Sequence, residues 1–173
     1  MNRMIYFFLV LCLASLSALG QNKPFYLKAS TGYIGGKADY KGVATELAVG
    51  YLPIKYASVE LALDNWYRYA QNSSSDTNTG LSLILHAHPI KIKRHSLDLF
   101  AGYGFNQIYW TNNYEEDHRT SFGRHMYRNF VWGAGYYYSF KSFDLGVMYK
   151  AQKFNDLVEN RGEQYLLSIK KNF

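Results

Sequence analysis

The stretch Tyr165-Leu166-Leu167-Ser168-Ile169-Lys170-Lys171-Asn172-Phe173 closes the chain, and its character alternates with a period of two residues. Successive side chains of a β-strand point to opposite faces, so every second residue shares a face. The mostly apolar face carries Tyr165, Leu167, Ile169 and Phe173, with Lys171 as its exception. The other, mostly polar face carries Leu166, Ser168, Lys170 and Asn172. The segment therefore predicts a strand with one side suited to lipid and the other suited to water.

The opposite end of the chain has the features of an export signal. Residues 1–20 combine a basic start, an apolar run over 4–13 and a small-residue site at 18–20, which is typical of a cleavable secretory signal. We therefore expect a mature domain over 21–173. The only cysteine, Cys12, lies inside the signal, so the mature domain has no disulfide and no thiol chemistry.

The composition favours β-structure over membrane helices. The chain of 173 residues has 17 Tyr, 11 Phe and 14 Gly but only three Pro. After residue 20 there is no run of roughly 20 apolar residues, which a membrane-spanning helix requires. A membrane domain without helices has to be a closed barrel, because lipid offers no hydrogen-bond partner to an open sheet edge.

Alternation bounded by turn residues predicts eight strands. They lie near 24–34, 44–52, 56–69, 79–88, 95–110, 128–140, 142–153 and 162–173. Long and short connections alternate between them, the turns 53–55 and 89–94 being short and the loop 111–127 the longest. Short turns on one side and long polar loops on the other are expected of bacterial barrels. The predicted fold is all-β, an eight-stranded antiparallel up-and-down transmembrane β-barrel.

Internal repeats support the strand count. Three strands that follow a short turn open with related phrases, Ser58-Val59-Glu60-Leu61, Ser96-Leu97-Asp98-Leu99 and Ser142-Phe143-Asp144-Leu145. Two short turns share Pro-Ile-Lys, at 53–55 and 89–91. The repeat has period-two hydrophobicity, which favours repeated hairpins over a helical solenoid.

Aromatic residues gather near the strand ends, as two interfacial girdles would require. One predicted girdle contains Phe25, Tyr51, Tyr56, Phe140 and Phe143, and the other contains Tyr67, Tyr69, Tyr109, Trp110, Tyr127 and Phe130. A soluble lipocalin-like barrel would instead turn its apolar faces inward. Periodicity alone leaves that alternative open, and the signal, the girdles and the terminal phenylalanine favour the membrane.

The whole mature chain resembles the small OmpA/OmpX-type eight-stranded outer-membrane barrels. The resemblance rests on the terminal segment 165–173 and on Leu97-Asp98-Leu99-Phe100-Ala101-Gly102-Tyr103-Gly104. It implies the outer membrane of a Gram-negative bacterium and a function without any cofactor. It also implies that Tyr165, Leu167, Ile169 and Phe173 serve as the assembly signal for the barrel-assembly machinery.

The inward faces collect charged side chains that are costly to bury unpaired. They are Lys28, Glu46, Glu60, Asp64, His86, His88, Asp98, Asp144, Lys150 and Lys170. Eight strands leave a lumen only wide enough for side chains, so a plug of ion pairs is expected, with a proton or ion path as the alternative. His86 and His88 share a face and could bind metal with Asp98, but two histidines are too few ligands, and we expect no metal.

The long loop 111–127 carries the candidate contact residues. They are Tyr114, His118, Arg119, Arg124, His125 and Tyr127. This chemistry suits lipopolysaccharide phosphates or a surface protein partner, and outer-membrane lipids surround the barrel. With the aromatics assigned to girdles, no nucleic-acid surface is expected. The predicted function is non-enzymatic surface contact or envelope integrity.

Two functional alternatives stay open. Enzymes that modify lipid A include eight-stranded barrels, and they need a nucleophile, a base and an acid at the lipid-facing rim. Ser121 lies near His118 and His125 in the sequence, but no deacylase-like His-x-Ser-Asn phrase occurs. The second alternative is a narrow pore for small solutes.

Overall fold

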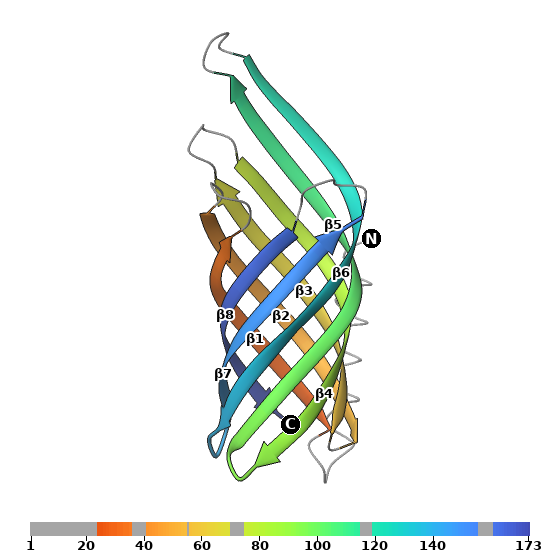
Figure 1. Ribbon diagram of the computed structural model, residues 1–173, viewed down its shortest axis with the longest axis vertical. Coiled ribbons are helices and arrows are strands. Elements are labelled where there is room, and N and C mark those ends of the chain that lie inside the picture. Colours follow the sequence, from red (N-terminus) through yellow and green to blue (C-terminus); the bar gives the residue numbers. More distant parts are fainter. Residues whose placement is uncertain (1–23, 36–40, 55, 70–74, 115–118, 156–160) are drawn as a thin grey trace, which may run out of the picture.

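The computed structural model describes residues 24–35, 41–54, 56–69, 75–114, 119–155 and 161–173, without the side chains of 111–122 and 161. Its strands are β1 (Phe25–Gly35), β2 (Lys41–Ile54), β3 (Ala57–Tyr69), β4 (Ser75–Ile92), β5 (His95–Tyr114), β6 (Arg119–Ser139), β7 (Asp144–Phe154) and β8 (Arg161–Asn172) (Figure 1). The expected signal at 1–20 lies outside the described residues and stays a prediction.

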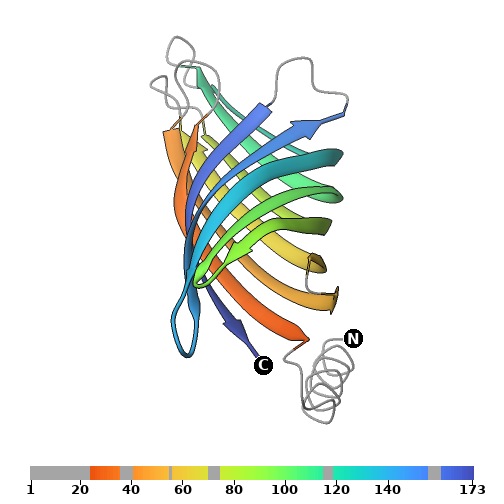
Figure 2. The same ribbon diagram turned by 60° about the horizontal axis from the view of Figure 1, so that its bottom comes forward.

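The eight strands form one closed antiparallel barrel, in which each strand pairs with the next. β8 closes the ring by pairing with β1, where Lys28 lies opposite Lys170 and Thr31 opposite Leu167 (Figure 2). Among the described residues, none belongs to a helix long and apolar enough to cross a bilayer. The predicted fold class is therefore confirmed.

Side chains alternate between the lumen and the outer surface along every strand. In β3, the residues from Ser58 to Arg68 at even positions are buried, while Leu61, Leu63 and Tyr67 are exposed. Outward leucines in mid-barrel are exposed, 63% for Leu47 and 56% for Leu83. A soluble barrel would not leave so continuous an apolar surface in water. The lipocalin alternative is therefore wrong, and the outer face is a lipid-facing belt.

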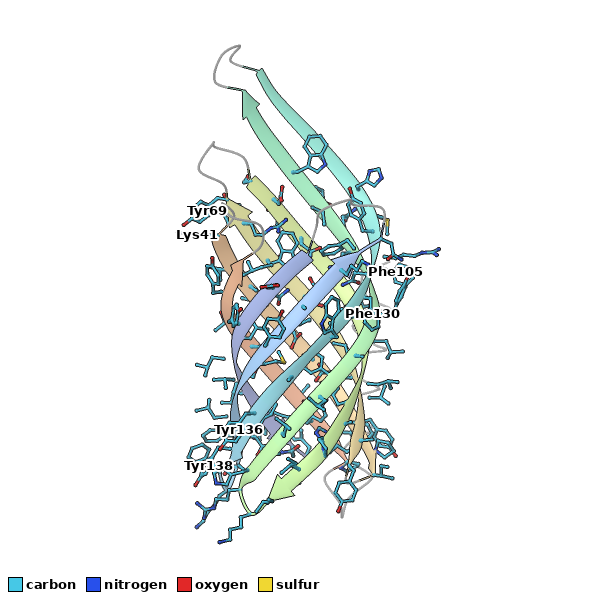
Figure 3. All side chains as sticks on the ribbon, in the orientation of Figure 1. Lys41, Tyr69, Phe105, Phe130, Tyr136 and Tyr138 are labelled. Carbon is cyan, nitrogen blue, oxygen red and sulfur yellow. The ribbon has the colours of Figure 1, made fainter. Side chains whose placement is uncertain are left out.

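Aromatic rings border this belt at both ends. Figure 3 shows Tyr69, Phe105 and Phe130 toward the end with the long connections, and Tyr136 and Tyr138 toward the end with the short turns. By the usual layout of such barrels, the short turns mark the periplasmic end and the long connections the extracellular end.

Two residues predicted for the extracellular girdle lie on the inner phase of their strands instead. Tyr127 packs against the inner core, with its ring edge-on to Phe154 at 6.3 Å between centroids. Trp110 shares the phase of buried Ile108, and a Cβ on Gly123 would collide with its ring. The prediction was wrong because aromatic character alone does not set the phase of a strand.

The predicted loop 111–127 is mostly a paired hairpin. β5 runs to Tyr114 and β6 starts at Arg119, and the two strands pair throughout from Tyr114 and Arg119 downward. Neighbouring strands end earlier, since β4 joins β5 only from Thr111 and β7 leaves β6 at Asn129. The β5–β6 hairpin therefore projects beyond the rest of the barrel (Figure 1). Its polar composition indicated a loop, but cross-strand pairing overrode composition.

One predicted turn is also shorter than expected. β4 continues through Pro89 to Ile92, and the chain reverses at Lys93, which has a φ of 52°. The β4–β5 register shifts between Ala87 and Ile90, so Pro89 lies at an interruption of the ladder. A proline at a bulge removes no ladder hydrogen bond, which is why the strand does not end there.

Deleting Phe173 is expected to lower the yield of folded barrel in membranes. The deletion removes the terminal ring and the bond from the Phe173 amide to the Phe25 carbonyl, 2.8 Å long, at the seam between β8 and β1. The measurement is the heat-modifiable band of membrane fractions on a gel. As a control, Phe140→Ala removes an exposed ring at the same barrel end without touching the seam. Equal folded yields of both variants would contradict the assembly role.

Candidate functional site

The lumen contains an alternating chain of acids and bases. Lys28 lies between two carboxylates, with its Nζ 2.6 Å from Glu60 Oε1 and 2.9 Å from Glu46 Oε1. Lys150 continues the chain, because its Nζ lies 2.5 Å from Glu46 Oε2 and also pairs with Asp64. All five side chains are buried. Each charge has an opposite neighbour, as burial in a narrow lumen requires.

The chain of charges crosses the barrel. Lys150 on β7 pairs with Glu46 on β2 and Asp64 on β3, although β8 and β1 separate β7 from β2 in the wall. These side chains therefore span the interior rather than following the wall. Side chains fill the lumen at this level, as expected for eight strands.

Hydroxyl groups satisfy the remaining carboxylate oxygens. Tyr26 donates to Glu60 Oε2 at 2.8 Å, and Ser82 donates to Asp64 Oδ2 at 3.2 Å. Tyr26 can adopt this position because its ring lies over Gly50, where a Cβ would come within 2.0 Å of it. Sequence reasoning missed these hydroxyls, and their inward phase was the available signal.

A second cluster lies beside the first at the periplasmic side. Asp98 Oδ2 lies 2.9 Å from His86 Nδ1, and its Oδ1 lies 3.4 Å from His88 Nδ1. His86 also approaches Glu60, at 3.5 Å, which links the two clusters. The sequence grouped Asp98 with His86 and His88 as possible ligands, and the structure brings these three side chains together.

Ser58 extends this cluster into a serine–histidine–aspartate order. Its Oγ lies 3.1 Å from His88 Nε2, and His88 in turn faces Asp98. In a hydrolytic triad, a serine likewise contacts a histidine that contacts an aspartate. However, Ser58 is only 2% exposed, and the contact of 3.4 Å between His88 and Asp98 is long for an orienting hydrogen bond. The geometry fits a buried polar cluster better than a nucleophile that a substrate reaches.

The periplasmic mouth holds the last two predicted lumen charges. Lys170 Nζ lies 3.8 Å from Asp144 Oδ2 and 4.4 Å from the centre of the Tyr137 ring. Asn172 also donates to Asp144, at 3.0 Å. All ten predicted lumen residues therefore lie on the inner face, eight of them buried and this pair half-buried.

No group of three or more histidine, cysteine, aspartate or glutamate side chains in the described part of the chain is arranged to hold a metal ion. The structure brings His86, His88 and Asp98 together, but their atoms face one another in direct contact. Direct contacts between the side chains leave no common position for a cation.

The extracellular half of the lumen is largely uncharged. Ile34, Trp66, Ile108 and Phe154 belong to the buried apolar cluster and lie toward the extracellular ends of their strands. Buried amides join them, and Asn106 donates to Asn78 at 2.9 Å. At the mouth, Arg68 pairs with Asp76 at 2.9 Å and stacks on Trp66. Apolar packing above the charge network therefore interrupts any continuous ionisable path.

The predicted contact residues are spread over the projecting hairpin. Arg124 and His125 are exposed on β6 and alternate in direction, with Arg124 outward and 5.7 Å from the Tyr109 ring centre. Tyr127 packs at the barrel mouth and is not part of a loop surface. Tyr114 lies at the end of β5 and Arg119 at the start of β6, and His118 lies outside the described residues. These residues form no single site.

The predicted assembly residues lie together on the outer surface of β8. Tyr165, Leu167, Ile169 and Phe173 are each about half exposed to the lipid-facing side. Their assembly role stays a prediction, and their position agrees with the expected apolar face of the closing strand.

No protein-family model and no curated protein sequence matches the chain. Solved structures do match. Neisserial surface protein A shares 14% identity, with 87% of this chain and 97% of that chain covered and a TM-score of 0.64. The N-terminal barrel of Pseudomonas aeruginosa OprF shares 22% identity, with 86% and 97% covered and a TM-score of 0.52. Ail of Yersinia pestis shares 11% identity, with 86% and 96% covered and a TM-score of 0.56.

At these identities the similarity shows a shared fold. The chain has the fold of the small eight-stranded outer-membrane barrels, and its lipid-facing belt and paired lumen charges are the physical features that this fold requires in a bilayer. The outer membrane is therefore the location that fold and surface indicate together.

Replacing Lys150 with methionine is expected to destabilise the barrel by roughly 3–5 kcal/mol, because Asp64 is then buried without a cation and Glu46 keeps only Lys28. The measurement is the denaturant midpoint of the refolded barrel in detergent micelles. Lys153→Met is the matched control, since Lys153 lies on the same strand but is exposed on the outside. Equal midpoints would mean that water reaches the lumen charges.

Proposed function

We propose that the protein is a non-enzymatic outer-membrane barrel of a Gram-negative bacterium that acts in surface contact or envelope integrity through its projecting hairpin. The observation that supports this most is the extension of β5 and β6 beyond their neighbours. Recognition surfaces are commonly carried by segments that a rigid scaffold holds out of the membrane.

The hairpin is suited to contact because it is ordered by its own pairing. Its two strands pair residue by residue from Tyr114 and Arg119 down to the barrel. Beyond Asn129, β6 has no β7 partner among the described residues, and the last bond to that side runs from the Asn155 amide to the Arg128 carbonyl. An unpaired strand edge above the membrane offers backbone groups to a partner.

A polyanionic partner is consistent with the cations of this region. Arg119 begins β6 and lies within the segment 111–122 at the end of the hairpin. Guanidinium groups bind phosphate and sulfate oxygens in pairs of hydrogen bonds. Ail, which shares the fold, has been crystallised with the heparin analogue sucrose octasulfate, so a barrel of this architecture can bind a sulfated oligosaccharide.

The filled lumen argues against a pore. Lys150 reaches across the barrel to two carboxylates, and apolar side chains close the extracellular half. Conduction would require breaking buried ion pairs, which is costly in a narrow lumen.

The arrangement of candidate nucleophiles argues against an enzyme. Ser121 and His125 lie four residues apart on β6, so their Cα atoms are separated by about 14 Å in an extended strand. Ser58 has a histidine partner but is buried inside the lumen, away from the lipid-facing rim. Acyl transfer needs a nucleophile that the substrate reaches.

Truncating the hairpin tests the proposal. Residues 111–122 are replaced by Asn-Gly, which joins Trp110 and Gly123, two residues that face each other in the register. The barrel is expected to fold, whereas cells lose adhesion to heparin-coated surfaces or admit more of a hydrophobic dye. The control replaces 36–40 by Asn-Gly between the register partners Gly35 and Lys41. If the truncated and control strains behave alike in both assays, the hairpin has no contact role.

The enzymatic alternative predicts a change in lipid A that the proposal does not. Mass spectra of lipid A from cells with and without the gene are expected to be identical, because no accessible nucleophile constellation occurs in the described residues. The same spectra are recorded for Ser58→Ala, Ser121→Ala and His125→Ala. A gene-dependent loss or gain of an acyl chain that any of these substitutions abolishes would establish an enzyme.

A further inference from the structure

Three outward cations at the base of the hairpin each lie opposite an aromatic residue on the neighbouring strand. The register pairs Arg124 with Tyr109 and Arg128 with Phe105 across β5 and β6. It pairs Lys153 with Phe130 across β6 and β7. All six side chains are exposed on the outer surface. We call the three cations the rim patch.

The rim patch lies at the upper boundary of the lipid-facing belt. Phe130 is eight residues from Tyr138 along β6, which corresponds to about 21 Å of height for a strand tilted by roughly 40°. Arg128 is two residues farther, and an outer-membrane apolar band is about 25 Å tall. Arg128 and Lys153 therefore reach the interface. Arg124 lies four residues farther along β6, about 10 Å higher. Figure 3 shows Phe105 and Phe130 at this upper boundary.

No carboxylate neutralises these cations within the described part of the chain. None of the three forms an ion pair there. Among the described residues, the outward carboxylate nearest in register is Glu163 on β8, opposite Ala151 on β7, and it forms no ion pair with Lys153. Arg128 and Lys153 are diagonal neighbours across two strands, a separation of about 7–8 Å that makes like charges repel. Such a pair at a lipid interface is stabilised by an external anion.

We propose that the rim patch binds the phosphate groups of lipid A, the phosphorylated glycolipid of the outer leaflet. The inference rests on the proposed outer-membrane location, and it names the partner of the barrel's outer face rather than of the hairpin tip. One phosphate lies between Arg128 and Lys153 and accepts hydrogen bonds from both. The acyl chains pack against Phe105 and Phe130 below, because these rings continue the apolar belt.

Arg124 extends the patch to a second phosphate. Its Cα lies about 14 Å from that of Arg128 along the strand, a span comparable to a disaccharide that carries a phosphate at each end. Its guanidinium already lies over the Tyr109 ring, 5.7 Å from the centroid, which limits the freedom lost on binding. Arg128 and Lys153 point outward from the barrel at the interface, which favours a membrane lipid over a soluble anion.

The test measures how much lipid A stays with the barrel. Wild-type protein and the triple variant R124Q/R128Q/K153Q are refolded into phosphatidylcholine vesicles that contain a minor fraction of bisphosphorylated lipid A. Each barrel is extracted in mild detergent, and the retained lipid is quantified by mass spectrometry. The wild type is expected to retain roughly tenfold more lipid A than the triple variant, as loss of charge-assisted contacts predicts.

Controls separate this site from general charge and from misfolding. K91Q/K93Q/K141Q removes three exposed lysines at the periplasmic end and is expected to retain lipid A like the wild type. Heat-modifiability verifies that every variant is folded. Further arms replace lipid A by its dephosphorylated form or by phosphatidylglycerol, or add inorganic phosphate as a competitor. The proposal is supported if the wild type retains neither dephosphorylated lipid A nor phosphatidylglycerol, and if inorganic phosphate does not reduce the amount of lipid A that it retains.

Three results would overturn it. They are equal retention by the triple variant and the wild type, equal retention of phosphatidylglycerol, and displacement by inorganic phosphate, which would indicate a site for free anions. The hairpin truncation ends at Gly123 and leaves the rim patch in place. Lipid retention and hairpin-dependent contact can therefore fail independently.

Discussion

The absence of water in the bilayer core is the constraint on which this structure depends. Every backbone amide and carbonyl at that depth needs a partner in the protein, so the sheet must close on itself. Closure joins β8 to β1, and Phe173 adds the last amide bond of the seam. Closure with only eight strands also fixes a narrow interior. The packing of the lumen and the chemistry of the outer face follow from these two consequences.

A narrow lumen turns charged side chains into mutual partners. Lys28 and Lys150 each lie between two carboxylates, and Glu46 joins them into one chain. Removing Lys28 leaves Glu60 without its lysine, and removing Lys150 leaves Asp64 without its lysine, so each lysine stabilises two buried acids. The histidine cluster around Asp98 uses the same principle with neutral and ionic contacts. A polar interior is compatible with a stable barrel because the buried lysines and carboxylates of the lumen form ion pairs with one another.

The outer face, in contrast to the lumen, is apolar as far as the membrane interface. Leucines face the hydrocarbon, rings mark its boundaries, and cations occur where headgroups begin. At the extracellular boundary these cations have no carboxylate partner in the described residues, in contrast to Lys28 and Lys150 in the lumen. A charge paired inside serves the fold, whereas a charge left unpaired at the rim serves a ligand. The β5–β6 hairpin projects beyond this boundary (Figure 1).

The sequence alone determined the architecture, because period-two alternation assigns each residue to lipid or lumen once a strand is recognised. It therefore identified the eight strands, the inward set of charges and the apolar face of 165–173. It did not determine which inward charges meet: Lys150 pairs with Glu46 and Asp64, since register and tilt decide which strands face each other across the barrel. Nor did it reveal the length of the β5–β6 hairpin. The polar residues of 111–127 have loop composition, and only pairing between neighbouring strands made 111–114 and 119–127 β-structure and turned Tyr127 inward.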